Sequence, residues 1–363
     1  MSDWSPLLDA PSFPVDEYAV LADRLAALLD TSNVILLVQG EAIIALEAAA
    51  TSLARPGLRV LNIVTSPYGA LFGNWLRRGG AVVEDLVAPA GKPIAAAAVE
   101  AALASALFDL VSLVHAESAS GILNPLPHIA RAVRATGALL VVDAVASFGG
   151  HALDVDALGI DIAVVGPQKS LGGAAGVSAL AVSARAWRQI EQPGGPTASV
   201  LSLLDLRAQW LDKGRGVLPG MPSPIEFHAL AAALARFEAE GLDAAIARHT
   251  RAGAVTRAAL KALGLAPWVP DAEASNLVTA AVLPAGIDRA SVLEALAPYA
   301  TGTAAAVGPG TDALLRLNHT GPRARFDTVL AIVVALGNAL ARAGASVDTG
   351  AAAETVAKGY ADQ

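Results

Sequence analysis

The chain has 363 residues, a formal net charge of −8 and no cysteine, and this length predicts about two domains. The absence of cysteine excludes disulfides and thiolate sites, and six histidines without the spacing of metal ligands predict no metal site. The chain is acidic and has no basic stripe, no apolar run of roughly 18 residues and no basic N-terminal segment. We therefore expect it to bind neither nucleic acid nor membrane and to be cytoplasmic.

The first half of the chain alternates apolar runs of strand length with alanine-rich helical stretches. The runs are continuously apolar, as in a parallel sheet that is covered on both faces. Such an alternation of strands and helices predicts a doubly wound α/β domain. The expected strands are residues 34–38, 60–64, 110–115, 138–143, 162–165 and 177–182, and the expected helices are residues 43–53, 95–106 and 129–135.

The second half of the chain predicts a smaller domain. Residues 186–224 are punctuated by glycine and proline, and a helical stretch over 225–263 follows them. Two further strands, at 276–282 and 314–318, then alternate with helices at 290–297 and 326–343, which predicts an α+β unit. The last residues are rich in Ala, Thr and Asp and are expected to fray. We therefore predict an N-terminal arm at 1–14, a large domain at 15–240, a small domain at 241–345 and a flexible tail at 346–363.

Polar side chains follow several of the predicted strands at the point where each strand ends. Glu41 comes shortly after the first strand and Ser118 after the third, Asp143 ends the fourth, and Lys169 follows the fifth. In open α/β sheets, ligands bind beyond the carboxyl ends of the strands. We therefore expect these groups to gather at one edge of the sheet and to form the site.

Lys169 and Asp143 are the two groups whose position suggests chemistry. Desolvation at a buried strand end lowers the pKa of a lysine ammonium, which makes its free amine available for a Schiff base. Taken alone, a lysine that extends to the surface is the commoner arrangement. A buried carboxylate at Asp143 needs a cationic partner, which a pyridinium N–H would provide, and a helix cap or a structural ion pair would serve equally well. The missing GxxxxGK segment excludes a P-loop lysine.

Three segments together resemble the motifs of class V, fold-type I pyridoxal-phosphate enzymes. Residues 141–150 (VVDAVASFGG) and 166–172 (GPQKSLG) resemble the aspartate and lysine segments, and residues 115–121 (HAESASG) resemble the H-G-E-[ST]-x-[ST]-G segment of the alanine–glyoxylate aminotransferase branch. The resemblance covers about residues 30–345. It implies a fold-type I aminotransferase with a mostly parallel, doubly wound α/β sheet in a large domain and a smaller C-terminal α+β domain. Pockets of this family form between subunits, so a homo-oligomer, either dimer or tetramer, is implied.

The resemblance also implies roles for individual residues. Lys169 would be the Schiff-base lysine, and Asp143 would hold the ring nitrogen. Ser118 would lie near the 3-hydroxyl of the ring, Val145 against one face of the ring, and Tyr68 where the family stacks an aromatic residue. Without the family, Tyr68 is equally well explained as an ordinary core residue.

Arg316, in the segment LLRLNHTG, matches the arginine that binds the substrate carboxylate in this family. A guanidinium fork suits a bidentate contact with a carboxylate. We therefore expect a small-molecule amino donor and a keto-acid acceptor to bind there, although a surface ion pair is the commoner role of an arginine.

The loop after the first strand departs from the phosphate-dependent members, which read S-G-[ST]-G-[TH]. In those proteins a helix N-terminus offers backbone N–H groups to the cofactor phosphate. Here Glu41 takes the place of the phosphate-binding hydroxyl and would use the same N–H groups. A dianion beside it would be repelled by roughly 4 kcal/mol per pair of unit charges at about 4 Å. Gln168 is a neighbour that suits a phosphate, and residues 220–224 offer only the hydroxyl of Ser223.

One branch of the family, the pyridoxamine–pyruvate transaminases, resembles this chain in the same loop. The resemblance extends to residues 46–50, 60–62, 72–75 and 198–202. In that branch the unphosphorylated vitamin B6 vitamer is bound as a substrate. The resemblance therefore implies that pyridoxamine and an α-keto acid are converted to pyridoxal and an amino acid, with Glu41 accepting a hydrogen bond from the 5′-hydroxymethyl group.

Other interpretations of the same residues stay open. Glu41 can be only a helix cap in a conventional aminotransferase of the alanine–glyoxylate or serine–pyruvate type that binds pyridoxal 5′-phosphate. A lyase on the same fold and a non-catalytic B6-binding protein are further alternatives. The second keto-acid arginine of the branch is absent from residues 306–312, which leaves the identity of the keto acid open.

Overall fold

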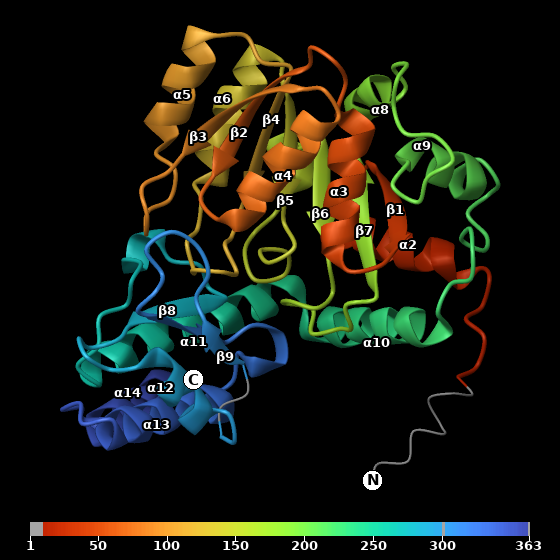
Figure 1. The fold of residues 1–363 in the computed structure, drawn as a ribbon. Helices are drawn as coiled ribbons and strands as arrows, with labels where there is room; N and C mark the ends of the chain where they lie inside the picture. The colour runs from red at the N-terminus through yellow and green to blue at the C-terminus, as the bar shows by residue number, and fades with distance from the viewer. Residues whose placement is uncertain (1–9, 300–301, 362–363) are drawn as a thin grey trace.

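A seven-stranded sheet forms the centre of the large domain in the computed structural model, which describes residues 10–299 and 302–361 (Figure 1). Most of the arm predicted at 1–14 and the end of the predicted tail lie outside these residues. The strands of the sheet are β1 (Val34–Gln39), β2 (Arg59–Val64), β3 (Val82–Val87), β4 (Leu110–Val114), β5 (Leu139–Asp143), β6 (Ile162–Val165) and β7 (Val177–Val182).

The strand order is β1-β7-β6-β5-β4-β2-β3. Strand β7 is antiparallel to both of its neighbours, and the remaining neighbours pair in parallel. The register places Asp143 beside Val114 on one side and beside Val164 on the other. The carboxyl ends of β4, β5 and β6 therefore lie next to one another, which confirms the expected mostly parallel α/β sheet.

Helices cover both faces of this sheet, as its continuously buried central strands require. Helix α3 packs on β6 and β7, and α4 packs on β2, β3 and β4, whereas α6 packs on β5 and lies behind the sheet in Figure 1. The helices of the large domain are α2 (Glu17–Leu28), α3 (Ala42–Leu53), α4 (Pro67–Arg78), α5 (Ala96–Ser105), α6 (Leu126–Thr136), α7 (Val155–Leu158), α8 (Ala184–Ile190), α9 (Leu203–Leu206) and α10 (Pro224–Glu240).

The small domain has a sheet and an apolar core of its own. Its three strands pair antiparallel in the order β8-β10-β9, and its core includes buried side chains from Ala252 to Val356. Helix α10 runs beneath the large sheet towards this domain (Figure 1). The elements are α11 (Leu242–Ala262), β8 (Val278–Val282), α12 (Arg289–Leu296), β9 (Thr303–Ala305), β10 (Leu314–Asn318), α13 (Phe326–Arg342) and α14 (Thr349–Ala361).

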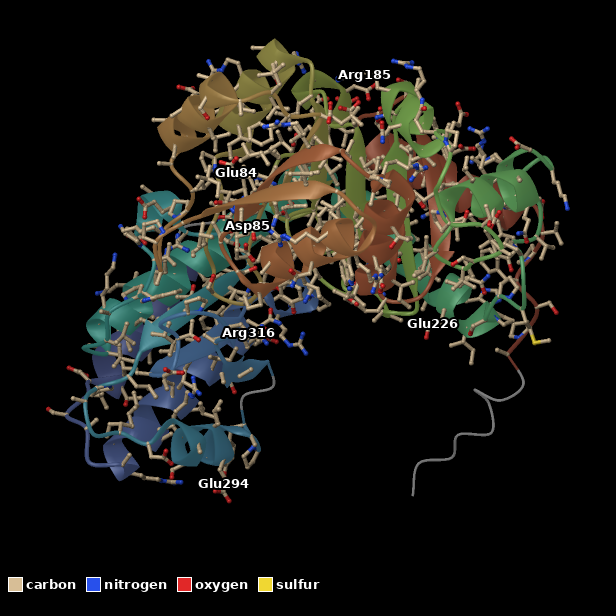
Figure 2. All side chains as sticks on the ribbon, turned by 45° about the horizontal axis from the view of Figure 1, so that its top comes forward. Glu84, Asp85, Arg185, Glu226, Glu294 and Arg316 are labelled. Atoms are coloured by element: carbon tan, nitrogen blue, oxygen red, sulfur yellow. The ribbon has the colours of Figure 1, made fainter. Side chains whose placement is uncertain are left out.

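Several elements of the structure differ from those expected. The tail predicted as flexible at 346–363 instead contains α14, which packs on α11 and α13 and buries Ala352 and Val356. The single helical stretch expected over 225–263 is interrupted at Gly241, whose φ of 86° ends α10. Strand β3 was not predicted because Glu84 and Asp85 interrupt its apolar pattern at the exposed edge of the sheet (Figure 2).

No helix in the described residues is both long enough and apolar enough to span a bilayer. The boundary predicted at residue 240 falls at the junction between α10 and α11.

Candidate active site

A cavity of about 270 Å³ lies at the carboxyl ends of β1, β4 and β5. Six of the eight residues proposed from the sequence line it: Glu41, Tyr68, Ser118, Asp143, Val145 and Lys169. Gln168 and Arg316 do not line it but contact residues that do. Sequence reasoning missed its apolar walls, which come from the first turns of α3 and from the ends of β4 and β5 and the loops that follow them: Ala42, Ile43, Leu46, Val114, Ala116 and Ala146.

Lys169 lies in the turn that follows β6 and faces the cavity. Its carbonyl accepts the N–H of Gly172 at 3.0 Å, and Gly321 of the small domain lies directly against the same carbonyl. A side chain at Gly321, where φ is 60°, would put its Cβ 2.6 Å from that oxygen. Burial lowers the pKa of the Lys169 ammonium, and the positive charge of Arg316 lowers it further. Both effects act towards the neutral, nucleophilic form of the amine, against the negative charges of Glu41 and Asp143.

Asp143 ends β5 and presents its carboxylate to the same cavity. One oxygen accepts the N–H of Val145 at 3.0 Å, so the local loop fixes the orientation of the group. Burial raises the pKa of Asp143 to about 6, against the opposing effects of the Val145 N–H and of Lys169. Within the described residues no protein group donates to the second oxygen, which leaves it available to a cationic N–H of a ligand.

Tyr68 supplies an aromatic wall of the cavity at the start of α4. The Ser66 hydroxyl caps this helix by accepting the Tyr68 N–H at 3.2 Å, and Pro67 fixes the first helical turn. The Tyr68 side chain remains 39% exposed, so it is not the ordinary core aromatic residue that the sequence also allowed. It is therefore accessible from the cavity.

Glu41 is the N-cap of α3, as the sequence predicted. Its Oε2 accepts the N–H of Ile43 at 2.8 Å, and its backbone carbonyl accepts the N–H of Ile44 at 2.9 Å. Its Oε1 accepts a hydrogen bond from the Gln168 Nε2 at 2.6 Å. The Glu41 side chain and backbone therefore use two N–H groups of the first turn of α3, and the Gln168 amide is directed at Glu41.

Arg316 lies on β10 where the small domain faces the large domain (Figure 2). Its Nη1 donates to the carbonyl of Ser118 at 2.9 Å, which ties β10 to the loop that follows β4. Its Nε is buried without a hydrogen-bond partner in the described part of the chain. A buried N–H without a partner is costly, so Arg316 retains a donor for a ligand.

Glu117 is a buried acid beside the cavity to which the sequence analysis gave no role. Its side chain is fully buried, and one oxygen accepts a hydrogen bond from Thr65 while the other has no partner among the described residues. Burial and, after it, the negative charge of Asp143 raise the pKa of Glu117 to about 7. Its position between His115 and Ser118 was the only signal in the sequence, because its hydrogen-bond partner Thr65 comes from another strand end.

Comparison with known proteins decides the family. Residues 18–318 match the family described as Aminotransferase class-V. The chain belongs to the class-V aminotransferase family. Members of this family use pyridoxal 5′-phosphate.

Comparison with individual proteins shows which members of the family this class-V aminotransferase resembles. It is 35% identical to the pyridoxamine–pyruvate transaminase of Mesorhizobium japonicum over 92% of this chain and 85% of that protein. It is 31% identical to the alanine–glyoxylate aminotransferase of Callithrix jacchus over 84% of this chain and 75% of that protein. The crystal structure of pyridoxamine–pyruvate aminotransferase from Mesorhizobium loti superposes with a TM-score of 0.91 at 33% identity, covering 100% of this chain and 92% of that one.

The arrangement of the class-V aminotransferase suits Schiff-base chemistry. It joins an amine with a lowered pKa, a carboxylate for a cationic ring nitrogen and an aromatic wall in one cavity, and these are the parts that a pyridoxal group requires. Among the described residues no group of three or more histidine, aspartate or glutamate side chains is arranged to hold a metal ion.

Proposed function

We propose that this aminotransferase acts on an unphosphorylated B6 vitamer, converting pyridoxamine and an α-keto acid to pyridoxal and an amino acid. The observation that carries the proposal is the first turn of α3, where Glu41 accepts the N–H of Ile43 and the amide of Gln168. The proposal includes small-molecule donor and acceptor substrates and a homo-oligomer, whose size light scattering would measure.

The first turn of α3 offers little to a phosphate. A phosphate at a helix N-terminus binds through the free N–H groups of that turn and the positive end of the helix dipole. Here two of these N–H groups are engaged by Glu41 itself, and its carboxylate adds a negative charge at the same position. Glu41 is exposed to solvent, which weakens the repulsion, so competition for donors contributes at least as much as charge.

A neutral hydroxymethyl group would meet the opposite situation. Each carboxylate oxygen of Glu41 accepts one hydrogen bond and retains a second acceptor position. A hydroxyl can donate to that position without displacing Ile43 or Gln168. The pair formed by Glu41 and Gln168 therefore suits a vitamer without a phosphate.

The remaining residues would orient the reacting groups. A bound pyridoxal supplies an aldehyde that condenses with amines and a ring that withdraws electrons. The carboxylate of Asp143 would keep the ring nitrogen protonated, and Tyr68 would fix the plane of the ring. The neutral amine of Lys169 would move the proton between the two carbon atoms that exchange it. Arg316 would hold the carboxylate of the keto acid or amino acid through its unpaired Nε.

A conventional phosphate-dependent aminotransferase is the second candidate. The 31% identity to an alanine–glyoxylate aminotransferase over 84% of this chain supports it. In that case Glu41 is only a helix cap, and the phosphate binds beside it.

Titration of the purified protein with pyridoxal and with pyridoxal 5′-phosphate tests the proposal. We expect a Lys169-dependent visible absorption band with both aldehydes and tighter binding of pyridoxal. Glu41→Ser removes the charge and leaves a hydroxyl that can donate to a phosphate oxygen, so it should shift the ratio of the two affinities towards the phosphate by roughly tenfold or more.

Glu47→Ser is the matched control. Glu47 lies on the same helix but pairs with Arg78 and does not line the cavity, so this variant should keep the affinity ratio of the wild type. Stronger binding of the phosphate by the wild-type protein would establish the conventional aminotransferase instead.

A further inference from the structure

A second cavity, of about 310 Å³, lies where α10 meets the small domain. Its walls are the turn after Lys169, the end of α10, one residue of α11 and the segment between β10 and α13 that contains Gly321. It shares no lining residue with the candidate active site. The lining residues are Ser170, Leu171, Arg236, Phe237, Glu240, Arg248, Gly321, Pro322 and Arg325.

This second cavity carries an excess of positive charge. It is lined by three arginines and one carboxylate, in a chain whose net charge is −8. Arg248 is neutralised, because its guanidinium binds both oxygens of Glu240 and its Nη1 donates to the Gly321 carbonyl at 2.6 Å. Of the other two arginines, both exposed, Arg236 forms no ion pair within the described residues and Arg325 forms only a long one with Asp327.

Arg236 and Arg325 retain most of their hydrogen-bonding capacity. The guanidinium of Arg236 makes one hydrogen bond, from Nη2 to the carbonyl of Gly172 at 2.9 Å. Arg325 makes no side-chain hydrogen bond in the part of the chain that the structure describes, and its Nε lies 3.9 Å from Asp327. Each guanidinium has five N–H donors in a planar fork that matches the oxygens of a carboxylate or phosphate.

We propose that this second cavity binds a small dianionic oxyanion, of the phosphate or dicarboxylate type, between Arg236 and Arg325. The cavity volume is that of a small-molecule site rather than of a macromolecular interface. Two arginine forks with free donors favour a ligand with several charged oxygens, since charge-assisted hydrogen bonds are the strong ones. The proposal does not depend on which B6 vitamer the active site takes.

Such an anion would act on the backbone around Lys169. Arg236 holds the carbonyl of Gly172, and Arg248 holds the carbonyl of Gly321. Gly172 donates to the Lys169 carbonyl, and Gly321 packs against it. An anion that bridges Arg236 and Arg325 would therefore link the Lys169 turn of the large domain to the small domain, which makes this cavity a candidate effector site.

Calorimetric titration of the full chain with inorganic phosphate tests the proposal, with ionic strength held constant by chloride. We expect saturable binding, and both Arg236→Gln and Arg325→Gln should weaken it by about tenfold or more. Arg131→Gln, on α6 and outside the second cavity, is the matched control and should bind phosphate as the wild type does. If Arg236→Gln disturbs folding, Arg325→Gln still tests the proposal, because the Arg325 side chain makes no hydrogen bond within the described residues that the substitution could break.

Arg316→Gln separates this second cavity from the active site. It should leave the phosphate affinity unchanged. The proposal is wrong if phosphate gives no saturable heat, if Arg325→Gln binds as tightly as the wild type, or if only Arg316→Gln abolishes binding.

Discussion

The charged groups at the two ends of the active-site cavity differ in whether the protein itself supplies their hydrogen-bond partners. At the ring end, Lys169 and Asp143 are both partly withdrawn from water, and burial moves their pKa values towards each other. At the other end, Glu41 already accepts hydrogen bonds from Ile43 and Gln168, and the Gln168 Oε1 is buried without a partner among the described residues. The charged groups of the ring end thus retain free hydrogen-bonding positions for a ligand, whereas the one charged group of the α3 end, Glu41, already has a partner on each oxygen. Under the proposed function, the ring end would perform the chemistry and the α3 end would select the vitamer.

The strongest test of the ring end is removal of its amine. Lys169→Ala should lower turnover by roughly 10³-fold or more, since proton transfer by a positioned group alone contributes up to about 10⁴-fold. The visible band with pyridoxal should also disappear. Lys92→Ala, which removes only an exposed ion pair with Glu273, is the control and should be fully active. An active Lys169→Ala protein would show that the amine of Lys169 does not take part in the reaction.

Substitution of Asp143 should cause the next largest loss of turnover. Asp143→Asn keeps an acceptor for the Val145 N–H but cannot compensate a cationic ring nitrogen. Loss of one electrostatic contact in a buried site costs about 10²- to 10³-fold in turnover. Steady-state kinetics would measure the loss, and an unchanged melting temperature would show that the fold is intact. Turnover near the wild-type value would mean that Asp143 is only a structural cap.

Arg316 should affect substrate binding more than turnover. Arg316→Gln removes the charge that would pair with a substrate carboxylate, and truncation of a buried charge pair costs roughly 30-fold or more in affinity. We expect the KM for the keto acid to rise by about that factor. Arg316→Lys should recover only part of it, because an ammonium cannot form the bidentate contact. An unchanged KM would place the carboxylate elsewhere.

The sequence predicted the ring end more fully than the rest because its signals are local. A continuous apolar run identifies a buried strand, and the next polar residue then marks the edge of the sheet, as with Asp143 and Lys169. Cap formation by Glu41 was also predictable from its position before α3. The pairing of Gln168 with Glu41 joins residues 127 positions apart, and no pattern in the sequence encodes that contact.

The same reasoning explains what was missed elsewhere. Strand β3 lies at an exposed edge, so its apolar period is interrupted by Glu84 and Asp85. Helix α14 is rich in alanine and lies at the end of the chain, and only its packing on α11 and α13 shows that it is ordered. Glu117 looked like one polar residue of a motif, which shows neither its burial nor its hydrogen bond with Thr65, 52 positions away.

The smallest expected effect is on stability, and it concerns Glu117 beside the ring end. Burial raises the pKa of Glu117 from 4.5 to about 7, so the unfolded chain loses this proton at lower pH than the folded chain does. The ionised carboxylate therefore reduces the free energy of unfolding progressively between about pH 4.5 and 7, and the reduction is complete above pH 7. Glu117→Gln cannot ionise and still accepts the hydrogen bond from Thr65.

Glu117→Gln should accordingly be more stable than the wild type at pH 8 by about 1–3 kcal/mol, and the difference should be much smaller at pH 5. Urea unfolding at the two pH values measures it. Glu294→Gln, on α12 of the small domain and labelled in Figure 2, is the exposed control and should show no such pH dependence. If Glu117→Gln were less stable than the wild type at pH 8, the ionised carboxylate would be stabilised by its surroundings, and the ring end would hold a second anion rather than a second buried acid.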